Sequence, residues 1–287
     1  MTILVLGGRG KTASHLASLL AAADVPFLLA TSSPSHKSPY SLTHFNWLDE
    51  ATYESPFIQT RSTALDPISA VYLVAPPIQD VAPPMLKFID LARARGVKRF
   101  VLLSASNVGK GGHSMGQAHA YLDSLGDVEY VALRPTWFME NLLEDPHLSW
   151  IKSENKIYSA TGNGKIPFIS AYDIARVAFH VLTQWKPREE EYLVLGQELL
   201  SYDKVAEILT TVMGREISHV SLPQLEFAKL LTDTVGLPVE FASMLADMEA
   251  EVGSGGEERL SDAVARVTGS SPLGFRDFVV REKDRWL

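Results

Sequence analysis

The strongest indication of the fold comes from the N-terminal sequence Thr2-Ile3-Leu4-Val5-Leu6-Gly7-Gly8-Arg9-Gly10-Lys11-Thr12-Ala13. An apolar run typical of a buried strand passes directly into a turn with the spacing Gly7-x-x-Gly10-x-x-Ala13, and an Ala- and Leu-rich helical pattern follows. Glycine permits a tight turn and close approach of a pyrophosphate to the backbone, and a small residue at position 13 lets the helix pack on the strand. The N-terminus of that helix favours a phosphate. The stretch therefore predicts a dinucleotide-binding turn.

Two other interpretations of this turn compete. Glycines also occur in strand-to-helix turns that bind nothing, and a Gly-x-x-Gly match alone is weak. In addition, Gly10-Lys11-Thr12 ends the phosphate-loop pattern Gly-x-x-x-x-Gly-Lys-Thr, but the first glycine of that pattern is replaced by Val5 inside the expected strand. The position of the motif between the first strand and the first helix favours a dinucleotide.

Short apolar runs alternate with amphipathic segments through the first half of the chain. This alternation is typical of a parallel sheet with crossover helices, and it predicts an α/β fold with a Rossmann-type parallel sheet. The expected strands are 3–6, 26–31, 70–75, 99–104, 129–133 and 191–195, and the expected helices are 13–23, 85–96 and 173–183.

The pattern changes after Arg134-Pro135, where an irregular, aromatic-rich segment begins. From Ser201 onward the chain is mainly helical, and one helix is expected to open at Ser201 and to close at Met213-Gly214. We expect a cofactor-binding Rossmann domain of residues 1–145 and 168–199 and a second, smaller, mainly helical substrate-binding domain of residues 146–167 and 200–287.

The end of the second strand bears on the choice of cofactor. An NAD enzyme would carry an acidic residue there for the ribose 2'-hydroxyl, whereas the chain has Thr31-Ser32-Ser33. The cationic residues Arg9, Lys11 and Lys37 are expected within reach of a 2'-phosphate. The sequence therefore favours NADP(H).

Composition excludes several classes of function. The net charge of -8 argues against a nucleic-acid partner, and the absence of cysteine excludes disulfides and thiolate catalysis. The eight histidines form no His-x-x-x-His pair, so no metal site is expected. There is no apolar run of about 18 residues and no signal-peptide pattern. We expect a cytoplasmic protein without a membrane segment.

Short-chain dehydrogenases protonate an alkoxide with tyrosine in Tyr-x-x-x-Lys, and no tyrosine of this chain has that lysine. Tyr121, for example, is followed four positions later by Leu125. We therefore assign no catalytic residue. An iminium ion needs no proton donor, because hydride added to its cationic carbon gives a neutral amine directly.

Gly112-His113-Ser114-Met115-Gly116 has the Gly-x-Ser-x-Gly spacing of the serine hydrolase nucleophile elbow. An elbow joins a strand directly to a helix, whereas Ser114 follows a glycine-rich loop, so a loop over the active site is favoured. His113 and His119 flank the serine and are candidates for contact with a substrate, but surface histidines without a role are as common.

Trp137-Phe138-Met139-Glu140-Asn141 follows the strand 129–133 at the carboxyl edge of the expected sheet, where ligands bind in open α/β folds. The aromatic side chains are either ordinary core or a flat apolar wall for an aromatic substrate. Glu140 is either a partner for a cationic substrate or a carboxylate at a helix start.

Three segments together, 7–13, 100–106 and 133–141, resemble those of the NmrA-like atypical short-chain dehydrogenases. The segments 158–170 and 173–177 are similar to those of reductases in ergot alkaloid biosynthesis. This similarity extends along the full length of the chain. This resemblance implies NADPH-dependent reduction of a tetracyclic iminium ion, formed when chanoclavine-I aldehyde cyclises, to a clavine alkaloid. The implied partners are this small aromatic alkaloid and an upstream enzyme of the pathway. NmrA-like proteins also include regulators that bind the dinucleotide without turnover, and this alternative stays open.

The resemblance also implies site residues. Where relatives carry an arginine after the second strand the chain has Ser32, so the contact to the 2'-phosphate is expected at Arg9 or Lys11. Cofactor contacts are expected at Gly7, Gly8, Arg9, Gly10, Lys11, Thr12, Ala13, Ser32, Ala75, Pro76, Ser104, Ala105 and Pro135, and substrate contacts at His113, Tyr121, Trp137, Phe138, Glu140 and Asn141.

Overall fold

The computed structural model describes residues 1–33, 38–63, 65–76, 78–183 and 189–287, and Lys37 lies outside these ranges. The described residues form two compact units. The first contains Met1–Pro135, Ala171–Val194 and Arg266–Gly269, and the second contains Thr136–Ser170, Leu195–Ala265 and Ser270–Leu287. The second unit begins at Thr136 rather than at residue 146 because Met139, Leu142 and Leu143 belong to its apolar core.

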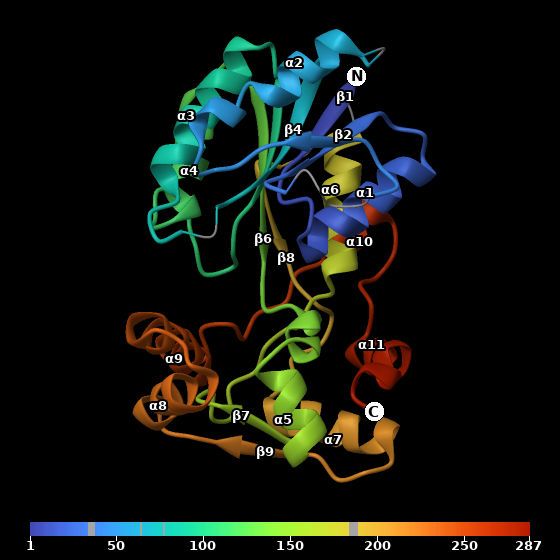
Figure 1. Cartoon of the computed structure of the whole chain (residues 1–287). Helices are drawn as coiled ribbons and strands as arrows, with labels where there is room; N and C mark the ends of the chain where they lie inside the picture. Colours follow the sequence, from blue (N-terminus) through green and yellow to red (C-terminus); the bar gives the residue numbers. More distant parts are fainter. Residues whose placement is uncertain (34–37, 64, 77, 184–188) are drawn as a thin grey trace. The chain divides into compact units, whose positions relative to one another are not determined.

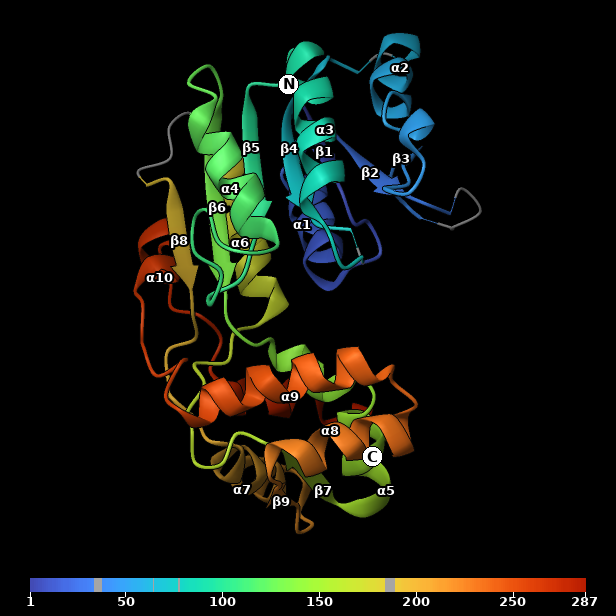
Figure 2. The same cartoon turned by 90° about the vertical axis from the view of Figure 1, so that its left-hand side faces the viewer.

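A seven-stranded sheet forms the centre of the first unit (Figure 1). Its strand order is β3-β2-β1-β4-β5-β6-β8, and each of these strands is labelled in Figure 2. All of its pairings are parallel, and the strand order reverses between β1 and β4, which creates a switch point there. The predicted Rossmann-type α/β fold is confirmed, and β3 is an addition to it. The strands are β1 (Thr2–Val5), β2 (Phe27–Thr31), β3 (Leu42–His44), β4 (Ile68–Val74), β5 (Arg99–Leu103), β6 (Glu129–Pro135) and β8 (Glu191–Val194).

Helices cover both faces of this sheet, α1 and α6 on one face and α2, α3 and α4 on the other (Figures 1 and 2). Helix α3 begins at Ala82, before Pro83-Pro84, because proline is tolerated in the first turn of a helix. The sequence predicted neither α2 nor α4. The elements are α1 (Lys11–Ala22), η1 (Glu50–Thr52), α2 (Ser55–Ser62), α3 (Ala82–Ala94), α4 (Met115–Ser124) and α6 (Ala171–Thr183).

The second unit is mainly helical, with a two-stranded parallel sheet of β7 and β9. Its apolar core includes Trp286, whose indole N–H donates to the carbonyl oxygen of Leu142 at 2.8 Å. Helix α7 opens and closes where predicted, with Ser201 as its N-cap and Gly214, at φ 69°, as its C-cap. The elements are η2 (Met139–Leu143), α5 (His147–Glu154), β7 (Lys156–Ser159), α7 (Tyr202–Met213), β9 (Ser218–Ser221), α8 (Gln224–Val235), α9 (Val239–Gly253), α11 (Phe275–Glu282) and η3 (Lys283–Arg285), while α10 (Ala263–Thr268) crosses the division between the units.

Within the described part of the chain, no helix is both long enough and apolar enough to cross a membrane.

Candidate functional site

The glycine turn lies between β1 and α1, at the switch point of the sheet. Gly7 has φ 70°, in the left-handed region that favours glycine. The amide of Gly8 donates to the carbonyl oxygen of Ala30 at 3.0 Å, and the amide of Gly10 donates to that of Gly7 at 2.7 Å. These bonds hold the turn tightly against β2, so that α1 begins immediately after it.

Close packing explains why glycine is needed at position 8. A Cβ there would lie 2.7 Å from the carbonyl oxygen of Ala30 and 2.7 Å from Cγ of Leu29, distances that real Cβ atoms do not adopt. No acidic residue lies in the first turn of α1, and its N-cap, Gly10, makes no side-chain cap. The positive end of the helix dipole is therefore not neutralised by the helix's own side chains, which suits a bound anion.

The remaining residues of the turn divide by exposure. Thr12 and Ala13 are buried, and the hydroxyl of Thr12 accepts a hydrogen bond of 3.1 Å from Tyr72 of β4, which ties the start of α1 to the sheet. Arg9 is exposed, and Lys11 is half-buried. Ser32 is exposed directly after β2. Cationic and hydroxyl side chains thus flank the turn, as a 2'-phosphate requires.

The other predicted cofactor residues follow neighbouring strands of the same sheet. Ala75 and Pro76 come after β4, Ser104 and Ala105 come after β5, and Pro135 ends β6. Because the strands are parallel, all of these residues lie at the carboxyl edge that also carries the glycine turn. The hydroxyl of Ser104 is buried and has no hydrogen-bond partner among the described residues. A buried polar atom of this kind calls for a partner, and a dinucleotide along this edge fits the residues present.

The predicted substrate residues Trp137, Phe138, Glu140 and Asn141 belong to the second unit, and all of them are half-buried. Their backbone is fixed by a bridge to Ile169, whose amide donates to Trp137 at 3.1 Å and whose carbonyl oxygen accepts from Met139 at 2.9 Å. Neighbouring Met139 and Leu142 are fully buried. Trp137 and Phe138 are less buried than these neighbours, as an apolar wall requires, although Trp137 also packs against the apolar core of the unit.

The structure places Tyr121 and His119 on α4 in surroundings that the sequence did not indicate. The hydroxyl of Tyr121 donates to Asp90 of α3, which raises the pKa of the phenol, so this side chain joins two helices. His119 is fully buried, in contrast to the surface position considered above, and burial lowers its pKa. His113 is exposed in the loop before α4.

Ser114 is the N-cap of α4 and has φ 52°. Its hydroxyl donates to the sulfur of Met115 at 2.9 Å, and no described histidine lies within hydrogen-bond distance of it. A serine nucleophile needs such a base. The arrangement gives the hydrolase interpretation no support.

The buried ionisable side chains of the second unit include Glu249 and His147, neither of which was predicted. Burial raises the pKa of Glu249 to about 8, although the amide of Ala160 donates to this carboxyl, and burial lowers the pKa of His147 to about 4. Glu249 follows Ala242 and Ala246 on the buried face of α9, so its helical spacing was a usable signal. Among the described residues, no group of three histidine or acidic side chains is arranged to hold a metal ion.

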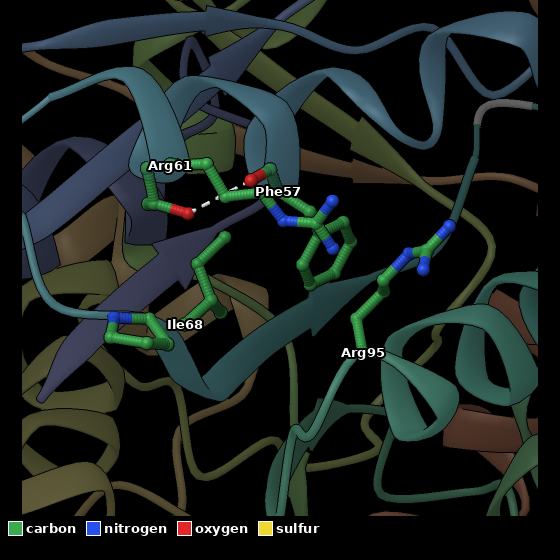
Figure 3. Close-up of a pocket in the computed structure, with 6 residues that line it drawn as sticks. Phe57, Arg61, Ile68 and Arg95 are labelled. Atoms are coloured by element: carbon green, nitrogen blue, oxygen red, sulfur yellow. Dashed lines mark hydrogen bonds between the residues drawn. The ribbon is translucent and has the colours of Figure 1, made fainter.

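A hollow of about 270 Å³ lies in the first unit. Figure 3 shows four of the residues that line it, Phe57, Arg61, Ile68 and Arg95. Ile68 is the first residue of β4, so the hollow lies at the amino edge of the sheet, opposite the glycine turn. Arg95 is held by an ion pair with Glu54. None of the predicted site residues lines this hollow.

Comparison with known proteins identifies relatives along the whole chain. The chain is 64% identical to festuclavine dehydrogenase of Aspergillus fumigatus, over 100% of this chain and 99% of the relative. It is 58% identical to festuclavine synthase I of Penicillium roqueforti, over 100% of both chains. The chain belongs to the festuclavine and agroclavine dehydrogenase family. Agroclavine dehydrogenase of Claviceps fusiformis, another member of this family, is 48% identical over 100% of this chain and 99% of its own.

The family resemblance stated from the sequence is thus confirmed, and the family's named members are oxidoreductases. None of the protein-family models that were compared matches the chain. Among solved structures, NADPH-dependent quinone oxidoreductase of Escherichia coli, in complex with NADPH, has a TM-score of 0.81 at 22% identity, over 97% of this chain and 99% of its own. Triphenylmethane reductase of Citrobacter, in complex with NADP(H), has a TM-score of 0.78 at 18% identity, over 98% of this chain and 99% of its own. At these identities the likeness establishes the fold.

Proposed function

We propose that the chain is an NADPH-dependent reductase of a tetracyclic iminium ion, formed by cyclisation of chanoclavine-I aldehyde, and that its product is a clavine alkaloid such as festuclavine or agroclavine. The observation that carries the proposal is the glycine turn at the switch point, in a chain 64% identical to a festuclavine dehydrogenase. When bound, NADPH supplies a hydride, and the iminium carbon accepts it while the π electrons move to nitrogen. The product is a neutral tertiary amine, and no proton is transferred.

In this proposal the first unit binds the cofactor. The amides of the turn from Gly7 to Gly10 and the start of α1 hold the diphosphate. Arg9 or Lys11, with Ser32, holds the 2'-phosphate, and Ser104, Ala105 and Pro135 border the nicotinamide. The chain has no Tyr-x-x-x-Lys pair, which agrees with a reaction that needs no proton donor.

In the same proposal the second unit binds the substrate through Trp137 and Phe138, two half-buried aromatic residues of a kind that packs against an aromatic ring system. Glu140 and Asn141 supply polar contacts, and the carboxylate of Glu140 favours a cation. His113 and Tyr121 are further candidates for contact with the substrate. Tyr121 is the weaker candidate of the two, because its hydroxyl already donates a hydrogen bond to Asp90.

The test is a mixture of purified protein, NADPH and cyclised chanoclavine-I aldehyde, followed at 340 nm. We expect protein-dependent loss of absorbance together with a clavine product in the mass spectrum. A regulator that binds NADPH without turnover would give binding in a titration and no loss of absorbance, and that result would discard the reductase.

A further inference from the structure

The segment Ser104–Ala105–Ser106, directly after β5, is held by an arginine from the neighbouring strand. The amides of Ser104 and Ser106 donate to the carbonyl oxygens of Leu133 and Pro135, each at 2.8 Å, so the backbone pairing of β5 and β6 extends past the end of β5. Arg134 lies between Leu133 and Pro135 in β6. Its Nη2 donates to the carbonyl oxygen of Ser106 at 2.8 Å, and its Nε donates to that of Ala105 at 3.4 Å.

The other end of the guanidinium is anchored to β8. Nη1 of Arg134 lies 3.1 Å from each carboxylate oxygen of Glu191, the first residue of that strand. The Arg134 side chain is only 16% exposed, so its charge is poorly solvated and depends on this partner. One planar group therefore joins the segment after β5 to β8, which lysine, with a single ammonium, cannot do in the same way.

His119 does not take the carboxylate away from Arg134. Its Nδ1 lies 4.0 Å from Glu191, beyond hydrogen-bond distance. Both ring nitrogens are buried and have no hydrogen-bond partner among the described residues, and burial lowers the pKa of the ring, which favours the neutral form. Within the described part of the chain, Arg134 is thus the cation that donates hydrogen bonds to Glu191.

We infer that Arg134, anchored by Glu191, is a positioning residue for hydride transfer, because it fixes the backbone of Ser104–Ser106. The inference rests on the proposed function, in which Ser104 and Ala105 border the nicotinamide. The unpartnered hydroxyl of Ser104 lies on the same segment, so a shift of the segment moves this hydroxyl as well. The guanidinium of Arg134 is engaged by the carbonyl oxygens of Ala105 and Ser106 and by Glu191, so we expect it to affect the reaction through the segment that it holds.

Arg134→Lys is the test variant, and Arg99→Lys is a matched control. Arg99 also joins two neighbouring strands and a backbone carbonyl: it pairs with Glu129 at 2.6 Å and donates to Leu182 at 3.0 Å. It is 12% exposed and is the first residue of β5, so it lies at the opposite edge of the sheet. Each variant replaces a guanidinium that contacts both a carboxylate and a backbone carbonyl. Of the two guanidinium groups, only that of Arg134 holds Ser104–Ser106.

Four quantities are measured for each variant: the melting temperature, the rate of amide hydrogen exchange at Ser104 and Ser106, kcat, and the affinity for NADPH. For Arg134→Lys we expect kcat to fall about 10- to 100-fold, the scale of a small misplacement of reacting groups. Exchange at Ser104 and Ser106 should be faster, and the affinity for NADPH should change much less than kcat. Arg99→Lys should lower the melting temperature and leave the exchange at these amides and kcat at their wild-type values.

The inference is overturned if Arg134→Lys matches Arg99→Lys in exchange and kcat, or if exchange rises while kcat does not change. Should Arg134→Lys fail to fold, Glu191→Gln removes the anchoring charge at a side chain that is 43% exposed, and the same shifts are expected in smaller measure. A wild-type protein that reduces no iminium would defeat the proposed function, and with it the role of Arg134 in hydride transfer, but not the hold of Arg134 on the segment. The exchange at Ser104 and Ser106 would then still decide whether Arg134 holds the segment.

Discussion

Gly8→Ala tests whether the turn approaches β2 as closely as the structure requires. The added Cβ would lie 2.7 Å from the carbonyl oxygen of Ala30, a backbone atom of a central strand that cannot move aside. The turn must therefore shift away from β2 by roughly half an ångström, at a cost of about 1–3 kcal/mol, as for other overpacked sites. The same shift displaces the amides proposed to bind the diphosphate. Loss of one charge-assisted hydrogen bond, about 1.5–3 kcal/mol, corresponds to roughly a 10- to 100-fold weaker Kd for NADPH.

The assay pairs thermal unfolding with isothermal titration of NADPH. Gly96→Ala is the control, because Gly96, just after the end of α3, has φ 95° and an added Cβ there would have no atom of the described residues within 4 Å. The left-handed backbone should make this variant less stable by about 1–2 kcal/mol, with no change in the Kd for NADPH. Wild-type stability and wild-type Kd in Gly8→Ala would refute the packing argument.

Three further outcomes are expected in the second unit. Burial raises the pKa of Glu249 from 4.5 to about 8. The free energy of unfolding should therefore fall as pH rises from 4.5 to 8, by up to about 5 kcal/mol, because the folded state keeps this carboxyl protonated while the unfolded state does not. Glu249→Gln should therefore unfold at a higher temperature than wild type at pH 8 and show less advantage at pH 5; an equal difference at both pH values would contradict this. The pKa of His147 is lowered from 6.5 to about 4, so stability is lost as pH falls from 6.5 to 4, by about 3 kcal/mol. In His147→Phe, the free energy of unfolding measured with urea should depend less on pH across that range. An unchanged pH dependence would count against the burial of a neutral ring. Trp137→Ala should raise KM for the iminium about tenfold with the Kd for NADPH unchanged, and wild-type steady-state kinetics would remove Trp137 from the substrate site.

The Rossmann part of the fold was predictable because its signals are local. β1, the glycine turn and α1 follow one another within the first 22 residues, and each carries its own pattern of apolar residues or glycine. Helix α4 was missed because its buried face includes Gly116 and His119, neither of which marks an apolar stripe. β3 has only three residues, Leu42–His44, and is too short for a recognisable alternation.

The predicted cofactor residues were found at one edge because parallel strands bring their carboxyl ends together, a consequence of topology that sequence can anticipate. The partners of single side chains could not be anticipated in this way. Tyr121 and Asp90 are 31 positions apart, and the packing of α3 on α4 brings them into hydrogen-bond contact. Arg134 and Glu191 are 57 positions apart, and the alignment of β6 with β8 brings them together. Arg134 lies in the segment 133–141, which carries part of the family resemblance, yet the neighbouring residues in the sequence do not indicate which groups its side chain binds.

Transfer of hydride from the nicotinamide to the iminium carbon is tested most directly with NADPH deuterated at the transferring position of C4. The wild-type protein, given this cofactor and cyclised chanoclavine-I aldehyde, should yield a clavine amine that carries one deuterium at the former iminium carbon, as read by mass spectrometry and proton NMR. A clavine product without deuterium, or no product while the deuterated cofactor binds, would contradict the proposed chemistry.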